Sequence, residues 1–192
     1  MEHFYTLQGE GRFAGTPSYF IRLGGCDIGC HWCDVKESWD AATHPKMEIN
    51  EIVKIASETC KTIVITGGEP LMYNLDQLTL ALKNNGCKVH IETSGAYSLS
   101  GKLDWICLSP KKNKLPLPAL YQKANELKVI IYNQHDFLFA KEQAELVNTN
   151  CELYLQPEWS KKDTITQQVV DFVLENPNWK ISLQTHKYLN IP

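Results

Sequence analysis

Three cysteines, Cys26, Cys30 and Cys33, stand in one short segment with the spacing Cys-x3-Cys-x2-Cys. Thiolates on one short loop can bind a single soft metal centre. Four thiolates would close a zinc site or a [4Fe–4S] cluster, whereas three leave one iron of a cluster without a protein ligand. Such an iron is useful when a small molecule binds to it, so the spacing favours a [4Fe–4S] cluster. A structural zinc ion with a distant fourth ligand stays open as an alternative, and His31 inside the segment is one candidate donor.

The remaining cysteines do not show this spacing. The chain has seven cysteines in 192 residues, an odd number that cannot pair completely within one chain. The four outside the segment are scattered near the ends of expected elements, and we interpret them as small apolar residues: Cys60, Cys87, Cys107 and Cys151. The segment Met1–Phe4 lacks the basic and apolar stretch of a secretion signal, so a disulfide framework is disfavoured and the cytoplasm is the expected location.

A second motif, Gly67-Gly68-Glu69-Pro70, follows a run of β-branched residues. Taken alone, it is typical of a turn between a strand and a helix. It also suits a ligand site, because glycines allow close approach of the backbone while carbonyl groups and Glu69 face an ammonium group. The motif by itself does not decide between these two interpretations.

The elements that must position these residues alternate along the chain. Strands are expected at 19–23, 62–66, 88–93, 105–108, 127–132, 152–156 and 179–183, and helices at 49–59, 75–85, 118–125, 136–147 and 163–175. Repeated strand–helix units predict a parallel sheet with helical crossovers. A closed (β/α)8 barrel takes about 250 residues, so we expect an incomplete TIM-type (β/α) barrel forming a single domain over residues 1–192. An open doubly wound sheet is the second choice, weakened by the lack of a Gly-x-Gly-x-x-Gly helix entry.

The chemically interesting segments all follow strands. Besides the cysteine loop and Gly67–Glu69, they are Glu92–Gly95, Ser109–Lys111 and Gln156–Pro157. The carboxyl ends of parallel strands share one edge, where barrels and open sheets carry their sites. The sequence therefore predicts one site that these segments build together.

The segment from Cys26 to Cys33, with Trp32 before its last cysteine, resembles the signature of radical S-adenosylmethionine enzymes. In that superfamily the open iron chelates the amino and carboxylate groups of S-adenosylmethionine, and an electron from the cluster cleaves the sulfonium to give a 5′-deoxyadenosyl radical. The resemblance implies a [4Fe–4S] cluster on the three cysteines. It also implies these contacts to S-adenosylmethionine: Gly67, Gly68, Glu69, Gly95, Ser109, Pro110, Lys111 and Gln156.

The two ends of the chain resemble a narrower group. Thr6–Gly11, Gln184–Lys187 and the terminal Pro192 are similar to segments of the 7-carboxy-7-deazaguanine synthase family, whose members serve queuosine and related deazapurine biosynthesis. The resemblance implies a lyase that contracts the ring of 6-carboxy-5,6,7,8-tetrahydropterin, with loss of ammonia. The substrate contacts that it implies are Leu7, Gln8, Gly9, Glu10, Arg22, Thr93, His186 and, through the terminal carboxylate, Pro192.

The chemistry of these residues agrees with that substrate. A pterin edge presents donors and acceptors, which Glu10 and Gln8 can meet. A carboxylate is bound well by the fork of a guanidinium, which Arg22 supplies.

One position departs from the family. Two residues after the third cysteine, the family commonly has Thr or Ser, thought to bind Mg²⁺, and here Val35 stands there. Valine offers no oxygen to a hard cation. Asp34 or a water could serve as the ligand, another cation could be used, or the metal could be dispensable. We hypothesise a weaker or altered dependence on Mg²⁺.

Two other functions stay open at this point. An activase of a glycyl-radical enzyme would share the cysteine loop and Gly67–Pro70, and a zinc-binding, non-catalytic module would share only the cysteines. The family further implies flavodoxin or ferredoxin as electron donor and a homodimer. The net charge of −3 argues against a nucleic-acid partner, and the apolar runs are too short for a membrane span.

Overall fold

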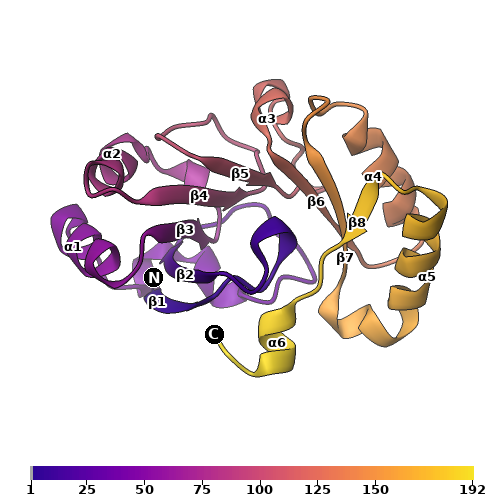
Figure 1. The fold of residues 1–192 in the computed structure, drawn as a ribbon, viewed down its shortest axis with the longest axis horizontal. Coiled ribbons are helices and arrows are strands. Elements are labelled where there is room, and N and C mark those ends of the chain that lie inside the picture. Colours follow the sequence, from indigo (N-terminus) through magenta and orange to yellow (C-terminus); the bar gives the residue numbers. More distant parts are fainter. Residues whose placement is uncertain (1) are drawn as a thin grey trace.

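A single curved sheet forms the centre of the molecule (Figure 1). The computed structural model describes residues 2–192, and the strands follow one another in chain order from β1 to β8. The strands are β1 (Glu2–Leu7), β2 (Pro17–Leu23), β3 (Thr62–Gly67), β4 (Lys88–Thr93), β5 (Trp105–Leu108), β6 (Glu126–Ile131), β7 (Glu152–Pro157) and β8 (Trp179–Ile181). β1 pairs antiparallel with β2, and all later pairs are parallel. β1 and β8 are the two edges, so the barrel is incomplete, as predicted.

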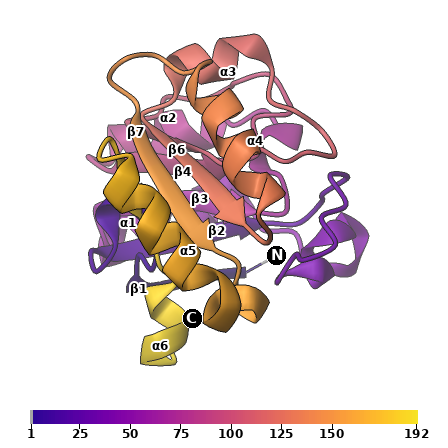
Figure 2. The ribbon, with the colours of Figure 1, turned by 90° about the vertical axis from the view of Figure 1, so that its right-hand side faces the viewer.

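Helices connect the parallel strands from β2 to β8, except that a loop joins β4 to β5, and one more helix follows β8. They are α1 (Ile49–Thr59), α2 (Asp76–Asn84), α3 (Pro118–Lys123), α4 (His135–Ala144), α5 (Lys162–Glu175) and α6 (Thr185–Leu189). Figures 1 and 2 show α1 to α5 along the outer side of the sheet, while α6 lies apart from them, near β1. No helix within residues 2–192 has the length and apolar character that crossing a membrane requires.

The strands alternate in polarity, and this alternation separates the core from the site. Ile65, Ile91 and Leu155 are fully buried in the apolar core, where the sheet packs against the helices. Because successive side chains of a strand point to opposite faces, the neighbours of these residues face the inside of the curve. Glu92 and Gln156 are such neighbours, and both line a cavity there. The outer face of the sheet is therefore apolar, and its inner face carries polar groups.

All the elements expected from the sequence are present, and each expected strand matches the observed one within two residues. Among the strands and α-helices of residues 2–192, two were not expected. β1 carries no alternating apolar pattern of its own and is held by its partner strand, with Phe4 stacked on Phe20 at 5.5 Å between ring centroids. α6 has only five residues, too few to show a helical period.

The packing of α2 gives a test of the core. Leu82 is fully buried, whereas Leu80, on the same helix, is 52% exposed. We expect Leu82→Ala to lower the free energy of unfolding by about 2–5 kcal/mol, since it leaves a cavity. Leu80→Ala should change it by less than about 0.5 kcal/mol. Urea unfolding curves measure both, and equal losses would contradict this packing.

Candidate active site

A cavity of about 250 Å³ opens at the carboxyl ends of the parallel strands, inside the curve of the sheet. It gathers nearly all of the residues that the sequence singled out. Those that line it are Leu7, Gln8, Gly9, Glu10, Arg22, Cys26, Cys30, Cys33, Asp34, Val35, Gly67, Gly68, Glu69, Thr93, Ser109, Lys111, Gln156, His186 and Pro192. Each strand-end segment that was expected at this edge contributes at least one residue to the cavity, as predicted, and Leu7–Glu10, His186 and Pro192 join them from the two ends of the chain.

Gly95 and Pro110 are not among the lining residues. Gly95 has a φ of +76°, and a Cβ there would lie 2.4 Å from a methyl carbon of Leu108. A glycine is thus needed at this position for the turn and for packing on β5. The role of these two residues as cofactor contacts stays a prediction.

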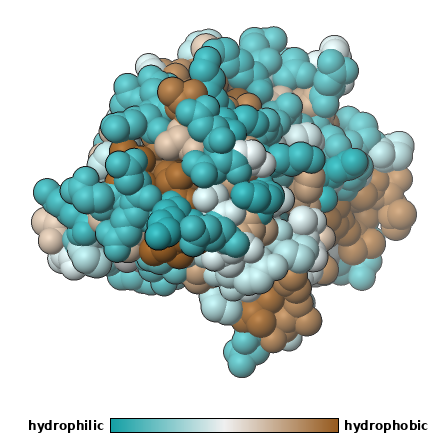
Figure 3. Space-filling view, turned by 60° about the vertical axis from the view of Figure 1, so that its left-hand side comes forward, coloured by the Kyte–Doolittle hydropathy of each residue, from teal (hydrophilic) through white to brown (hydrophobic). Residues whose placement is uncertain are grey.

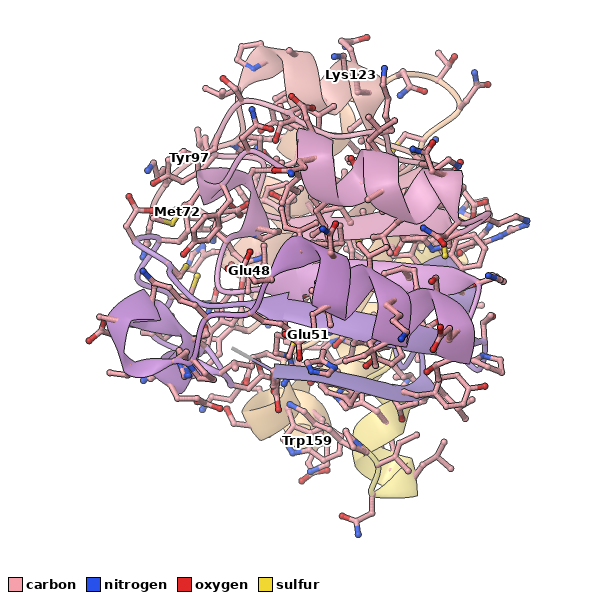
Figure 4. All side chains as sticks on the ribbon, turned by 90° about the vertical axis from the view of Figure 1, so that its left-hand side faces the viewer. Glu48, Glu51, Met72, Tyr97, Lys123 and Trp159 are labelled. Atoms are coloured by element: carbon pink, nitrogen blue, oxygen red, sulfur yellow. The ribbon has the colours of Figure 1, made fainter. Side chains whose placement is uncertain are left out.

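The cysteine loop follows β2 and is anchored from outside the cavity. The amide of Asn113 donates to the carbonyl oxygens of Ile28 and Gly29, at 3.2 and 2.9 Å. Asp27 accepts hydrogen bonds from the hydroxyl of Tyr97 at 2.5 Å and from the ammonium of Lys114 at 2.9 Å. Figure 4 labels Tyr97 on this side of the molecule. These bonds hold the loop without using the cysteines.

The three thiols face one cavity and have no disulfide partner. Burial raises the pKa of both Cys26 and Cys30, so these groups are neutral thiols near pH 7 unless a cation is bound. A bound metal centre would hold them as thiolates and release their protons.

The arrangement of the donors bears on the kind of metal. Within residues 2–192, no three side chains of His, Cys, Asp or Glu are grouped so that they could hold one metal ion. A structural zinc ion needs four donors in one tetrahedron, and His31, the candidate fourth donor, is not among the residues that line the cavity. A cluster places each thiolate on a different iron, and the three cysteines around one cavity fit that requirement.

The Gly67–Pro70 turn packs directly on the cysteine loop. A Cβ on Gly67, where φ is +134°, would lie 2.1 Å from the carbonyl oxygen of Leu23, and one on Gly68 would lie 2.2 Å from that of Gly25. The two glycines therefore permit the close approach of two backbones. Both glycines also line the cavity, and their contact with S-adenosylmethionine stays a prediction.

Glu69 is 1% exposed, and its carboxylate accepts four hydrogen bonds. The donors are the backbone N–H of Leu71 at 2.9 Å, the hydroxyl of Thr93 at 2.6 Å, and the N–H and hydroxyl of Ser94 at 2.8 and 2.5 Å. These donors tie the turn after β3 to the end of β4. Glu69 thus shapes the cavity wall, and its contact with S-adenosylmethionine stays a prediction.

A network of charged groups fills the other side of the cavity. Lys128, on β6, is 2% exposed and forms ion pairs with Glu10 and with Glu92, the latter at 2.9 Å. The amide of Gln8 donates to Glu92 at 2.8 Å, and that of Gln184 donates to Glu10 at 2.9 Å. The side chains predicted to meet a pterin edge, Gln8 and Glu10, are therefore held in place by neighbours from β4, from β6 and from the segment before α6.

The charges of this network follow from its contacts. Burial alone would raise the pKa of Glu10, but attraction to Lys128 and hydrogen bonds from Lys128 and Gln184 lower it to about 2. Burial likewise lowers the pKa of Lys128, but the acidic groups around it outweigh this and raise it well above its ordinary value. Glu10 is thus ionised and Lys128 protonated throughout the neutral pH range.

The C-terminal segment, residues 184–192, forms part of the cavity wall. The backbone N–H of Thr185 donates to the carbonyl of Gly9 at 2.9 Å, and a Cβ on Gly9 would collide with the ring of His186. Burial lowers the pKa of His186, so its imidazole is neutral at pH 7. Trp159, labelled in Figure 4 beside α6, meets Tyr188 with 5.1 Å between ring centroids.

Asp34, next to Cys33, is bound by this same segment. Its carboxylate accepts from Lys187 at 2.6 Å and from Gln184 at 3.2 Å. Val35 lines the cavity beside it with an apolar side chain. The oxygen donor that could have replaced the missing Thr or Ser is therefore neutralised by an ammonium group, and the residues present do not fit a Mg²⁺ ion.

Arg22 lines the cavity and also contacts two residues of β1. One of its N–H groups donates to Glu2 at 2.5 Å, and its guanidinium lies 5.2 Å from the centroid of the Phe4 ring. Since a guanidinium has five donors, most of its fork stays available to a substrate carboxylate.

Several lining residues were not named as cofactor or substrate contacts from the sequence, and three of them are polar members of the network: Lys128, Gln184 and Glu92, the last of which was expected there only as part of Glu92–Gly95. A signal was present for the two charged ones. Glu92 follows the buried Ile91, and Lys128 lies between the buried Leu127 and Val129; charged residues in such apolar surroundings are rare unless they are paired. Gln184 had no comparable signal beyond its place in the C-terminal motif.

Comparison with known proteins agrees with this geometry. The model of the Radical SAM superfamily matches residues 20–105. A 7-carboxy-7-deazaguanine synthase from Flavobacterium psychrophilum is 62% identical over 192 residues, which are all of this chain and 91% of that protein. The chain belongs to the 7-carboxy-7-deazaguanine synthase family. A synthase from Synechocystis is 49% identical, over 99% of this chain and 91% of that protein.

Solved structures extend the comparison to the synthase fold. The crystal structure of QueE from Escherichia coli superposes with a TM-score of 0.84 at 31% identity, over 96% of this chain and 92% of that one. SuiB from Streptococcus suis, at 13% identity and a TM-score of 0.58, shares the fold alone. The partial barrel and the radical S-adenosylmethionine character of the synthase are thereby confirmed. The family implies a [4Fe–4S] cluster and S-adenosylmethionine as cofactors, and it disfavours the glycyl-radical activase and the zinc module.

The assignment of the cysteine loop can be tested through iron content. We expect Cys30→Ala to lose the roughly four irons per chain of the reconstituted protein, because one thiolate ligand of the cluster is removed. Cys60→Ala, outside the cavity, should keep them and serves as the control. Iron and sulfide analysis, together with the absorption of the cluster, measures the difference. Full iron content in Cys30→Ala would contradict the assignment.

Proposed function

We propose that this chain converts 6-carboxy-5,6,7,8-tetrahydropterin into 7-carboxy-7-deazaguanine with loss of ammonia, on the way to queuosine or a related deazapurine. One observation carries the proposal: a single cavity has three cysteine thiols on one side and the ordered Gln8–Glu10 network on the other. A cofactor that makes a radical and a heterocycle with a polar edge would meet between them. The family of its relatives supports the same reaction.

Cys26, Cys30 and Cys33 would hold the cluster, and the strand ends on the same side would hold S-adenosylmethionine. When bound, the two supply a 5′-deoxyadenosyl radical that abstracts a hydrogen atom from the substrate. Of the contacts implied by the family, Ser109 and Lys111 form a unit, because the ammonium of Lys111 donates to the carbonyl and hydroxyl oxygens of Ser109 at 2.7 and 2.6 Å. This fixes the loop after β5 against the cavity.

On the substrate side, the role of each residue follows from its chemistry. Glu10 is ionised and would accept hydrogen bonds from the amino and ring N–H groups of the pterin. Arg22 would bind the substrate carboxylate. His186 is neutral and lies against Gly9, where its imidazole would contact the pterin ring without adding a charge. Leu7, Thr93 and Pro192 complete the lining.

The partners follow from the same reaction. A one-electron donor must reduce the cluster, and we propose flavodoxin or ferredoxin, as the family suggests. The homodimer and the cytoplasmic location stay predictions from the sequence. For the cation we propose that turnover does not depend on Mg²⁺, since Asp34 is paired with Lys187 and Val35 offers no oxygen.

The reaction is tested by an anaerobic assay. We expect the reconstituted protein, supplied with 6-carboxy-5,6,7,8-tetrahydropterin, S-adenosylmethionine and dithionite, to form 7-carboxy-7-deazaguanine and ammonia. Mass spectrometry and an ammonia assay measure both products, and Cys30→Ala is the inactive control. A protein that keeps its cluster and cleaves S-adenosylmethionine without forming the deazapurine would sink the proposal.

The dependence on Mg²⁺ is tested with the same assay. After chelation by EDTA, we expect added Mg²⁺ to change the rate by less than about twofold, because no hard oxygen ligand is free beside the third cysteine. Sodium chloride at equal ionic strength is the control. Activation that is strong, specific to Mg²⁺ and reversed by chelation would show that the pairing of Asp34 does not exclude the ion.

A further inference from the structure

Lys128 has a donor that its protein contacts do not use. It projects from β6 into the cavity and is 2% exposed. An ammonium group has three N–H donors. The hydrogen bonds found over residues 2–192 use two of them, one to Glu10 and one to Glu92 at 2.9 Å. A buried cation with a remaining donor at a cavity wall is suited to bind an acceptor on a ligand, since water there is scarce.

The position of this donor matches one particular feature of a pterin. The lactam of the ring presents an N–H group and a carbonyl oxygen side by side, and the amino group lies beyond the N–H. A carboxylate in contact with an ammonium is the complement of that edge, since one accepts from the N–H and the other donates to the carbonyl. Glu10 and Lys128 are such a pair.

Among the cations that line the cavity within residues 2–192, Lys128 is the one that forms an ion pair with Glu10, and the others have different partners. Among the described residues that line it, Arg22 is paired with Glu2. Lys111 donates to two oxygens of Ser109, and its ammonium lies 5.4 Å from the centroid of the Trp32 ring. Lys128 is therefore the permanent cation that stands against the carboxylate predicted to meet the pterin.

We propose that Lys128 binds the ring carbonyl of the pterin, while Glu10 accepts from the adjacent ring N–H, so that the pair distinguishes a lactam from an amino-substituted ring. This inference rests on the proposed function, and it adds a specificity-determining residue to it. Lys128 then has two roles in one position, because it also holds Glu10 and Glu92 in place.

If Lys128 only held its neighbours in place, its replacement would not change which ligand is preferred. The net charge of the cluster decides which variants can test this. Glu10, Glu92 and Lys128 carry a net charge of −1 when ionised. Lys128→Met alone leaves two carboxylates uncompensated, a change that can disturb folding by itself. The double variant Lys128→Met with Glu92→Gln restores the net charge of −1, and Glu92→Gln alone keeps the ammonium. Gln at position 92 can still accept from Gln8, so these two proteins form a matched pair.

The experiment compares two ligands in the reconstituted protein with S-adenosylmethionine. Pterin-6-carboxylate has a carbonyl at C4, and 2,4-diaminopteridine-6-carboxylate has an amino group there. Calorimetry gives the dissociation constants of both ligands for the wild type, for Glu92→Gln and for the double variant. We expect the preference for the carbonyl compound to persist in Glu92→Gln and to fall by about 10- to 100-fold in the double variant, the loss typical of a hydrogen bond to a charged group.

The outcomes separate this inference from the function on which it rests. Equal preferences in Glu92→Gln and the double variant would overturn the role of Lys128 while leaving the function intact. If the preference for the carbonyl compound returns in the double variant at pH 8.5, its loss at lower pH came from protonation of Glu10. That result would also overturn the role of Lys128. If the wild type binds neither compound and forms no deazapurine, the proposed function itself fails.

Discussion

A buried ammonium group sets the requirements for one half of the site. Lys128 lies inside the curved sheet, where an unpaired charge would cost several kcal/mol. It is stable there because Glu10 and Glu92 are both in contact with it. These contacts tie β6 to β4 and to the turn after β1. They also keep Glu10 ionised, so the carboxylate that we propose for the pterin edge depends on a cation from the opposite part of the sheet.

The other half of the site depends on close packing of backbone. Gly67 and Gly68 bring the turn after β3 against the loop after β2, at a distance that no Cβ would allow. Glu69 then joins that turn to β4 through Thr93 and Ser94. As a result, three strand ends form one rigid wall beside the cysteines. A substitution in this turn would move the cysteine loop even if it removed no contact with a ligand.

The C-terminal segment links the two halves. The amide of Gln184 donates both to Glu10 on the pterin side and to Asp34 beside the last cysteine. Lys187 forms an ion pair with Asp34, so the carboxylate beside the last cysteine already has a cationic partner from the protein. The same segment includes α6, which projects from the molecule. Figure 3 shows hydrophobic side chains gathered at the lower end of the molecule. Tyr188 and Leu189 of α6 are more than half exposed.

The sequence by itself determined the local features. The spacing of Cys26, Cys30 and Cys33 predicted one metal-binding loop, and the alternation of strands and helices predicted a partial barrel with its site at the carboxyl edge. Both follow from short-range rules of spacing and periodicity. β1 and α6 escaped those rules, because one is held by its partner strand and the other is too short to show a period.

Only the tertiary structure decided which charges meet. Lys128 and Glu10 are 118 residues apart in the chain, and Lys187 and Asp34 are 153 apart. No local pattern specifies such pairs, since they arise from the curvature of the sheet and from the return of the chain end beneath it. The residue types set what chemistry the site can perform, and the fold set which of them are neighbours, which are neutralised and which still have a donor to offer.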